Sequence, residues 1–287
     1  MADSYRGAFA GWKVLGVASL LGAACPAMAG STYNIMLTGY WPPTGDMVRH
    51  FSTNPEQNPG GWQGGNFKGR GYNVYSFFPE FPGGTGVNSK GEGDFEVDYQ
   101  DTSADWWRIT SDIKPCAIIT FSWTSGRLTN GQKDWEIENR NRNRTTWTND
   151  YEGPRQPDKI PPDDSIAPNA SRFSSLPKAN IQNAVNAAGL GLTAYVDDAG
   201  GGNFLSEYIG YHGLWYQSLH SSPDDPYQTF AAGHIHVGAK VTTAEGRLAT
   251  EITLDQLMDY LDTVIPAPST GALAAAACVL AGRRRRS

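Results

Sequence analysis

The stretch LTAYVDDAGGGNFLSEYIGYHGLWYQSL, residues 192–219, decides the fold of this chain. Its first five residues form a short β-branched and aromatic run that predicts a strand. The glycine-rich segment 197–202 predicts a turn, and 204–219 predicts a helix. A strand that leads through a tight loop into a helix is the repeating unit of doubly wound α/β proteins, and such loops build their active sites.

Similar units extend this pattern along the chain. We expect further strands at 33–39, 72–78, 113–121 and 231–241, and further helices at 105–113, 176–188 and 254–261. The segment 151–171 is crowded with proline and aspartate, which predicts irregular structure. The sequence therefore predicts an α/β fold, namely a single-domain three-layer α/β/α sandwich with a mostly parallel twisted sheet.

The amino-terminal residues are expected to lie outside this domain. Residues 1–29 combine Arg6 and Lys13 with an apolar run and end in Ala27-Met28-Ala29, which is typical of a secretory signal peptide. Lipidation at Cys25 is the alternative, although Gly22 stands where a lipidation motif favours a large aliphatic residue. We expect cleavage by signal peptidase, which leaves 30–265 as the folded domain.

The carboxyl-terminal residues 266–287 contain Pro266-Ala267-Pro268-Ser269, a short apolar segment and four arginines. The apolar segment is too short to cross a hydrocarbon core of about 30 Å comfortably. This order resembles the PEP-CTERM sorting signal, which usually has Glu where this chain has Ala267; a basic terminal helix is the alternative. The resemblance implies a bacterial protein of the periplasm, cell envelope or extracellular surface, handled by an exosortase-type sorting enzyme, with transient membrane contact through the tail.

Charge and cysteine content narrow the classes of function. The formal net charge of −6 and the lack of a basic stripe argue against nucleic-acid binding. Cys116 is the one cysteine of residues 30–265, so we expect no internal disulfide. It lies in an apolar run and is expected to be a buried small residue rather than a nucleophile. We expect no cofactor, and the sequence leaves a homo-oligomer open.

Candidate catalytic residues fall where the predicted fold can bring them together. Ser206 lies at the start of the helix 204–219, where partial positive charge favours a developing anion. His236 lies in a predicted strand, two residues after His234, and could accept a proton from a hydroxyl group. Glu136 and Glu138 are candidates to orient that imidazole. The alternatives are a helix-capping serine, a core histidine pair, or a two-histidine metal site, which lacks further obvious ligands.

Six segments in order resemble pyroglutamyl peptidase type I: Thr38-Gly39, Gly126-Arg127, Glu138 to Asn143, Ser175-Leu176-Pro177, Gly202 to Tyr211, and Gly233 to Val237. That family is a single-domain α/β/α hydrolase, phosphorylase/hydrolase-like in fold, that removes an amino-terminal pyroglutamyl residue with a Glu, a Cys and a His. The resemblance places the His on His236 and the acid on Glu138, with Glu136 as a competitor. The family's Cys falls on Ser206, which is the largest departure.

The resemblance also implies the substrate-binding residues. Tyr40 keeps one aromatic ring of the family's first loop, whereas Pro43 replaces the second ring and Trp41 is added. Arg127 could steady an oxyanion, and Asn143 completes the Glu-x-x-x-x-Asn motif. The expected partner is a peptide or small amide, cleaved by a Ser-His-Glu triad. The alternative is a noncatalytic envelope or surface binding protein that has lost the nucleophilic Cys.

Overall fold

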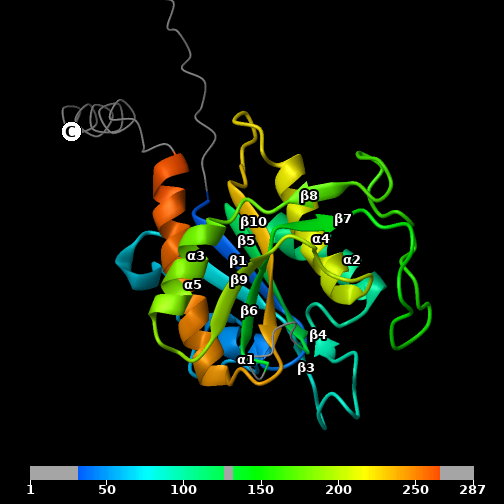
Figure 1. The fold of residues 1–287 in the computed structure, drawn as a ribbon, viewed down its shortest axis with the longest axis horizontal. Helices are drawn as coiled ribbons and strands as arrows, with labels where there is room; N and C mark the ends of the chain where they lie inside the picture. The colour runs from blue at the N-terminus through cyan, green and yellow to red at the C-terminus, as the bar shows by residue number, and fades with distance from the viewer. Residues whose placement is uncertain (1–31, 126–131, 266–287) are drawn as a thin grey trace, which may run out of the picture.

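The structure, a computed structural model, describes residues 32–125 and 132–265 and has a six-stranded sheet at its centre (Figure 1). The order across the sheet is β2-β1-β5-β10-β6-β9. These strands are β1 Asn34–Gly39, β2 Asn73–Phe77, β5 Ala117–Thr124, β6 Asp134–Glu138, β9 Thr193–Asp197 and β10 Ala231–Gly238. Every neighbouring pair is parallel except β10 and β6, so the predicted mostly parallel sheet is confirmed.

Helices cover both faces of the sheet. Buried residues of α1, α3 and α5 join the apolar core on one face, and those of α2 and α4 join a second core on the other. The bounds are α1 Thr44–Val48, α2 Tyr99–Ile113, α3 Lys178–Ala187, α4 Leu205–Leu219 and α5 Thr243–Val264. The predicted single α/β domain with three layers is therefore confirmed.

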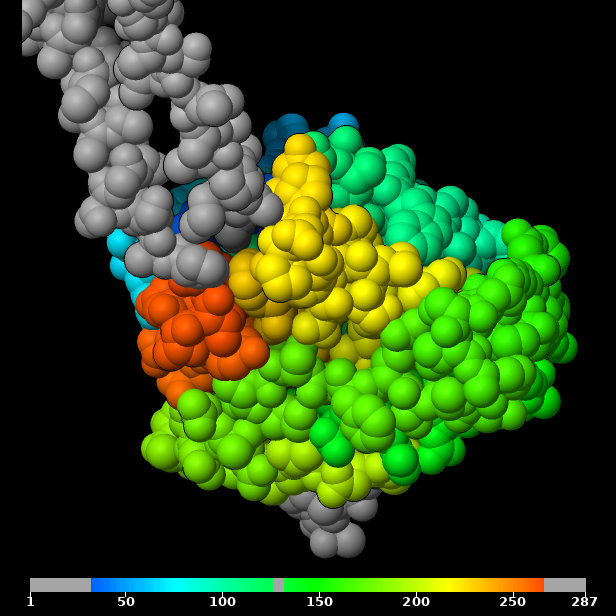
Figure 2. All heavy atoms as spheres, turned by 90° about the horizontal axis from the view of Figure 1, so that it is seen from above, coloured from blue at the N-terminus to red at the C-terminus, as the bar shows by residue number. Residues whose placement is uncertain are grey.

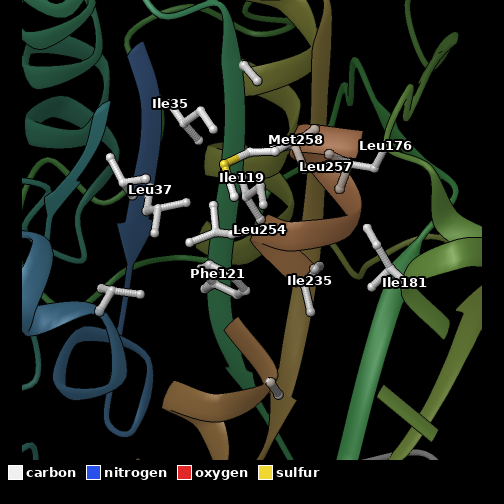
Figure 3. Close-up of a cluster of buried hydrophobic side chains, with 14 of the residues drawn as sticks. Ile35, Leu37, Ile119, Phe121, Leu176, Ile181, Ile235, Leu254, Leu257 and Met258 are labelled. Atoms are coloured by element: carbon white, nitrogen blue, oxygen red, sulfur yellow. The ribbon is translucent and has the colours of Figure 1, made fainter. Parts of the chain in front are cut away.

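The face under α1, α3 and α5 is a continuous aliphatic core. Side chains from β1, β5 and β10 meet side chains from α5 in its middle (Figure 3). Ile119, Ile235 and Leu257 are among its fully buried members. Burial of an aliphatic side chain of this size stabilises the fold by about 1.5–3 kcal/mol. This core fixes the sheet that carries the site.

Small elements surround the sheet. They are the 3₁₀ turns η1 Arg49–Phe51 and η2 Phe67–Gly69, and the two-stranded pairs β3 Pro79–Glu80 with β4 Glu92–Gly93 and β7 Arg140–Arg142 with β8 Ser171–Phe173. The segment 143–170 between β7 and β8 has no helix or strand, which agrees with the irregular structure predicted for 151–171 except that β8 begins at Ser171. In the space-filling view its green surface lies against the yellow surface of α4 (Figure 2).

Several boundaries differ from the prediction for identifiable reasons. Helix α5 begins at Thr243 rather than 254, because Thr242 and Glu245 form a reciprocal capping box. Helix α2 begins at Tyr99 rather than 105, because the Asp98 side chain accepts hydrogen bonds from two backbone N–H groups of its first turn. That helix reaches Ile113, so β5 starts only at Ala117.

Besides the small elements, one helix and one strand of the central sheet were absent from the prediction. Helix α1 follows the first loop directly, and β6 occupies Asp134–Glu138. All five residues of β6 are buried, although three of them are acidic. Within the described ranges, no helix has both the length and the apolar character needed to cross a membrane.

Candidate active site

The site lies on the sheet face that is covered by α2 and α4. Side chains of a strand alternate between the two faces, so each central strand sends every second residue to this face. Near the carboxyl ends of β5 and β10 these residues are polar, and so are those of the neighbouring β6. They are Thr120, Ser122, Glu136, Glu138, His234 and His236, and all of them are buried.

His236 is in direct contact with Glu138. The His236 Nδ1 atom lies 2.9 Å from Glu138 Oε1, and the Glu138 side chain is completely buried. Burial by itself would raise the pKa of Glu138, but the adjacent His236 and the amide of Asn141 more than offset it and hold the pKa below its ordinary value. Glu138 therefore stays an anion against the imidazole.

Glu136 occupies a different position from Glu138. In the β10–β6 register it stands directly opposite His236, but its Oε2 accepts a hydrogen bond of 3.0 Å from the Tyr195 hydroxyl. Its side chain contributes to the wall of the cleft described below. Of the two predicted acids, Glu138 is the one that the structure pairs with His236.

His234 is a hydrogen-bonded core residue. Its Nδ1 lies 2.7 Å from Thr120 Oγ1, its Nε2 lies 2.8 Å from Ser122 Oγ, and its ring packs edge-on against His236. Burial lowers the pKa of His234 to about 3, so the ring is neutral. Ligand atoms of His234, His236 and Glu138 lie within 4.8 Å of one another, close enough to consider a metal ion. Because both nitrogens of His234 already contact hydroxyl groups, we assign this cluster to hydrogen bonding.

A cleft of about 340 Å³ opens beside this cluster, and both His236 and Ser206 line it. Ser206 is the second residue of α4, whose cap is Phe204. No side-chain hydrogen bond caps this helix, so Ser206 does not serve as its cap. The first-turn backbone N–H groups of a helix lack intrahelical acceptors, which gives this end of the cleft a positive potential.

The cleft has an aromatic wall. Trp41 contacts Trp123 and Tyr151 at ring-centroid distances of 5.9 and 5.5 Å, and Tyr151 contacts Phe204 at 5.8 Å. All four rings line the cleft, together with Tyr40, whose hydroxyl bonds to Thr102. The two aromatic residues predicted from the first loop thus both lie at the cleft.

The other two predicted binding residues do not lie there. The Asn143 side chain is buried, and its amide donates to the carbonyl of Asp163 at 2.6 Å and accepts from the N–H of the same residue at 3.2 Å. Asn143 therefore anchors the segment between β7 and β8 and is not among the residues that line the cleft. Arg127 falls outside the described residues.

A second buried carboxylate, Glu207, is absent from the predicted site. It follows Ser206 on α4 and is fully buried. Its oxygens accept hydrogen bonds from Arg142 N, Asn141 Nδ2 and Arg144 Nε. Burial and the nearby Glu138 raise the pKa of Glu207 to about 7. Sequence patterns gave no signal for this anion, because Arg142 and Arg144 meet α4 only in the fold.

Comparison with known proteins gives structural relatives only. No protein-family model matches the chain, and no curated protein matches it. Pyrrolidone carboxyl peptidase from Thermococcus litoralis matches with a TM-score of 0.57 and 16% identity over 82% of this chain and 99% of that one. The enzyme of the hyperthermophile Pyrococcus furiosus matches with a TM-score of 0.54 and 17% identity over 79% of this chain and 99% of that one. At these identities the likeness establishes the fold.

Proposed function

We propose that this protein is an exported hydrolase that cleaves an amide, an N-terminal pyroglutamyl group or a related acyl group, through Ser206, His236 and Glu138. The observation that carries the proposal is the arrangement of these residues. A serine in the first turn of a helix and a histidine paired with a buried carboxylate line one cleft. The structural neighbours are named as pyrrolidone carboxyl peptidases, which supports an amide substrate.

The proposed reaction is acyl transfer. The Ser206 hydroxyl attacks the amide carbonyl carbon while His236 accepts its proton, and Glu138 stabilises the imidazolium that forms. Collapse of the tetrahedral intermediate breaks the C–N bond, and His236 returns the proton to the leaving amine. Water then attacks the acyl-enzyme by the same route and releases the acid. Positioned general-base catalysis of this kind contributes roughly 10²–10⁴ in rate.

The first turn of α4 and the adjoining glycine segment supply the proposed oxyanion site. Gly202 lines the cleft next to Ser206. The N–H of Gly200 is engaged, since it donates to Asp197 Oδ2 at 3.0 Å, so Gly202 is the better candidate of the segment 200–202. Backbone donors at this position would stabilise the developing negative charge without reorganisation.

The acyl-binding part of the cleft is assigned to the aromatic wall. Trp41, Trp123, Tyr151 and Phe204 present flat apolar surfaces, which suit a planar lactam ring or a larger acyl group. The added Trp41 and the missing second ring of the first loop make a different pocket from the one that the resemblance implies. Export through the segment 1–29 and sorting through 266–287 complete the proposal.

The function is tested with a panel of fluorogenic amides that begins with pyroglutamyl and extends to larger N-acyl groups. We expect turnover in the purified protein and a loss of about 10³-fold or more in Ser206→Ala. Ser125→Ala is the matched control, because Ser125 also lines the cleft but plays no part in the proposed reaction. Equal activity of the two variants, or no hydrolysis of any member of the panel, would contradict the proposal.

A further inference from the structure

Behind the His236–Glu138 pair lies a second carboxylate that the proposed reaction does not yet use. Glu207 comes from α4, whereas Glu138 comes from β6, and both side chains are fully buried. Two buried carboxylates side by side are costly unless both find hydrogen-bond donors. The arrangement of donors around Glu207 therefore shows what holds it in place.

A single amide connects the two carboxylates. The Nδ2 atom of Asn141 donates to Glu138 Oε2 at 2.5 Å and to Glu207 Oε2 at 3.1 Å. The other oxygen of Glu207 accepts from Arg142 N at 2.7 Å and from Arg144 Nε at 3.3 Å. The contacts form a chain from Arg144 through Glu207, Asn141 and Glu138 to His236.

The backbone beside the cleft is fitted to this pair. A Cβ atom at Gly201 would lie 2.7 Å from Glu207 Oε2 and 2.9 Å from Glu138 Oε1, so only glycine leaves room for both carboxylates. The carbonyl of Gly201 also accepts from Arg144 Nη2 at 2.7 Å. Because Gly202 lines the cleft, the carboxylate pair also sets where the proposed oxyanion site lies.

We propose that Glu207 is a positioning residue for the proposed reaction: through Asn141 it holds Glu138 against His236, and its charge helps to stabilise the imidazolium that forms when Ser206 loses its proton. This inference rests on the proposed function for its role in catalysis. The inferred coupling between Glu207 and His236 can be measured without turnover.

The surroundings of Glu207 determine when it is charged. Negative charge on one side comes from Glu138, whose carboxylate lies within 4.8 Å of those of Glu136 on β6 and Asp197 on β9. Arg144 supplies positive charge on the other side. The neutral His234 ring lies near Gly210 of the same helix. Since the pKa of Glu207 is raised to about 7, the carboxylate gains its charge as pH rises through neutrality. The support that it gives to the imidazolium is then present above this pH and lost below it.

The direct test is an NMR titration of the His236 ring in the unmodified protein and in Glu207→Gln. We expect the midpoint of the His236 titration in the variant to move to lower pH by about half a pH unit or more, because a nearby negative charge has been removed. Glu152→Gln makes the same chemical change at an exposed residue and should leave the midpoint in place. An unchanged His236 midpoint in a folded Glu207→Gln protein would overturn the inference.

The catalytic role is tested by the pH dependence of turnover. In Glu207→Gln we expect kcat to fall about 3- to 10-fold above pH 7 with little change in KM, and to approach that of the unmodified protein below about pH 6. A loss of the same size at every pH would show a merely structural role and would overturn the proposal. If the protein turns over no amide at all, the proposed function fails. The His236 titration still tests the coupling between Glu207 and His236 in that case.

A second route does not depend on the folding of Glu207→Gln. Carboxyl ¹³C signals of glutamate in the unmodified protein should show one group that titrates near neutral pH, with the His236 ring signals shifting in the same step. Asn141→Ala keeps the charge of Glu207 but removes the bridge, and we expect it to lower kcat across the whole pH range. Separate pH steps for the carboxyl and ring signals would contradict the inference.

Discussion

The two faces of the sheet differ in what their buried side chains do. Under α1, α3 and α5 the central strands contribute aliphatic and aromatic residues such as Ile119, Ile235 and Ile137. On the opposite face the residues next to these in sequence are Thr120, His236 and Glu138, which are equally buried but polar. At these positions one face therefore contributes apolar burial, whereas the other, beside its own apolar core, holds charged and hydrogen-bonded groups that cost stability unless each is paired.

Burial alone therefore does not mark a residue of the apolar core in this protein. Strand β6 is completely buried, yet its three acids point to the face that carries the site, where Glu136 lines the cleft. Its Trp135 and Ile137 face the aliphatic core. Substitutions on the two faces should consequently have separable effects on folding and on turnover.

The largest expected effect lies on the aliphatic face. Leu257→Ala should lower the free energy of unfolding by about 2–5 kcal/mol, since it leaves a cavity in the middle of the core. Ser122→Ala on the polar face removes only the hydroxyl contact to His234 and should cost about 1 kcal/mol. Urea denaturation measures both. A similar loss of unfolding free energy in the two variants would contradict the proposed difference between the two faces.

Lowering the pH below about 6.5 should reduce the free energy of unfolding through the buried histidines of the polar face. Burial lowers the pKa of His212 to about 4 and that of His234 to about 3, so each stays neutral in the folded protein while the unfolded chain takes up a proton near pH 6.5. Stability is therefore lost as pH falls from about 6.5, by about 1.4 kcal/mol per pH unit for each ring. Glu207 opposes this, because its raised pKa favours the folded state as pH falls from about 7 toward its ordinary range.

The measurement is urea denaturation between pH 7 and pH 5. His212→Phe removes one of the rings that avoid protonation, and the fall in stability with acid should become shallower by up to about 1.4 kcal/mol per pH unit. Trp107→Phe, which changes a partly exposed aromatic residue and no titrating group, provides a control whose slope should match that of the unmodified protein. If His212→Phe leaves the slope of unfolding free energy against pH unchanged, the His212 ring does not cause the loss of stability in acid.

The smallest expected effect concerns the aromatic wall. Trp41→Ala should raise KM for the best amide about tenfold, equivalent to about 1.4 kcal/mol of lost binding, with a smaller change in kcat. Trp107→Ala is the matched control, because Trp107 is 39% exposed and does not line the cleft. An equal KM in the two variants would show that the aromatic wall does not contribute to substrate binding.

Much of the fold was predictable because it rests on local patterns. The strand, loop and helix of residues 192–219 correspond to β9 and α4 within one or two residues. The ends of α5 and α2 were missed even though the capping signals of Thr242, Glu245 and Asp98 stand in the sequence. Strand β6 was missed for a different reason, since its alternate acids resemble a solvated segment until the opposite strand is known.

The site was predictable only in part, because pairings across strands are not local. Sequence patterns placed Ser206, His236, Tyr40 and Trp41, which all line the cleft. They could not decide between Glu138 and Glu136, since the choice depends on the antiparallel register of β6 and β10. Glu207 went unnoticed as a buried anion, because only the fold brings the arginine-bearing strand β7 against α4.

The most direct test of the central claim is labelling of the purified protein with a serine-directed phosphonate, followed by mass spectrometry of its peptides. Because the reagent reports an activated hydroxyl group, it requires no knowledge of the substrate. We expect a covalent adduct on Ser206 that is lost in His236→Ala, while Ser125 stays unlabelled. An unlabelled Ser206 in the folded protein, or labelling that persists without His236, would contradict it.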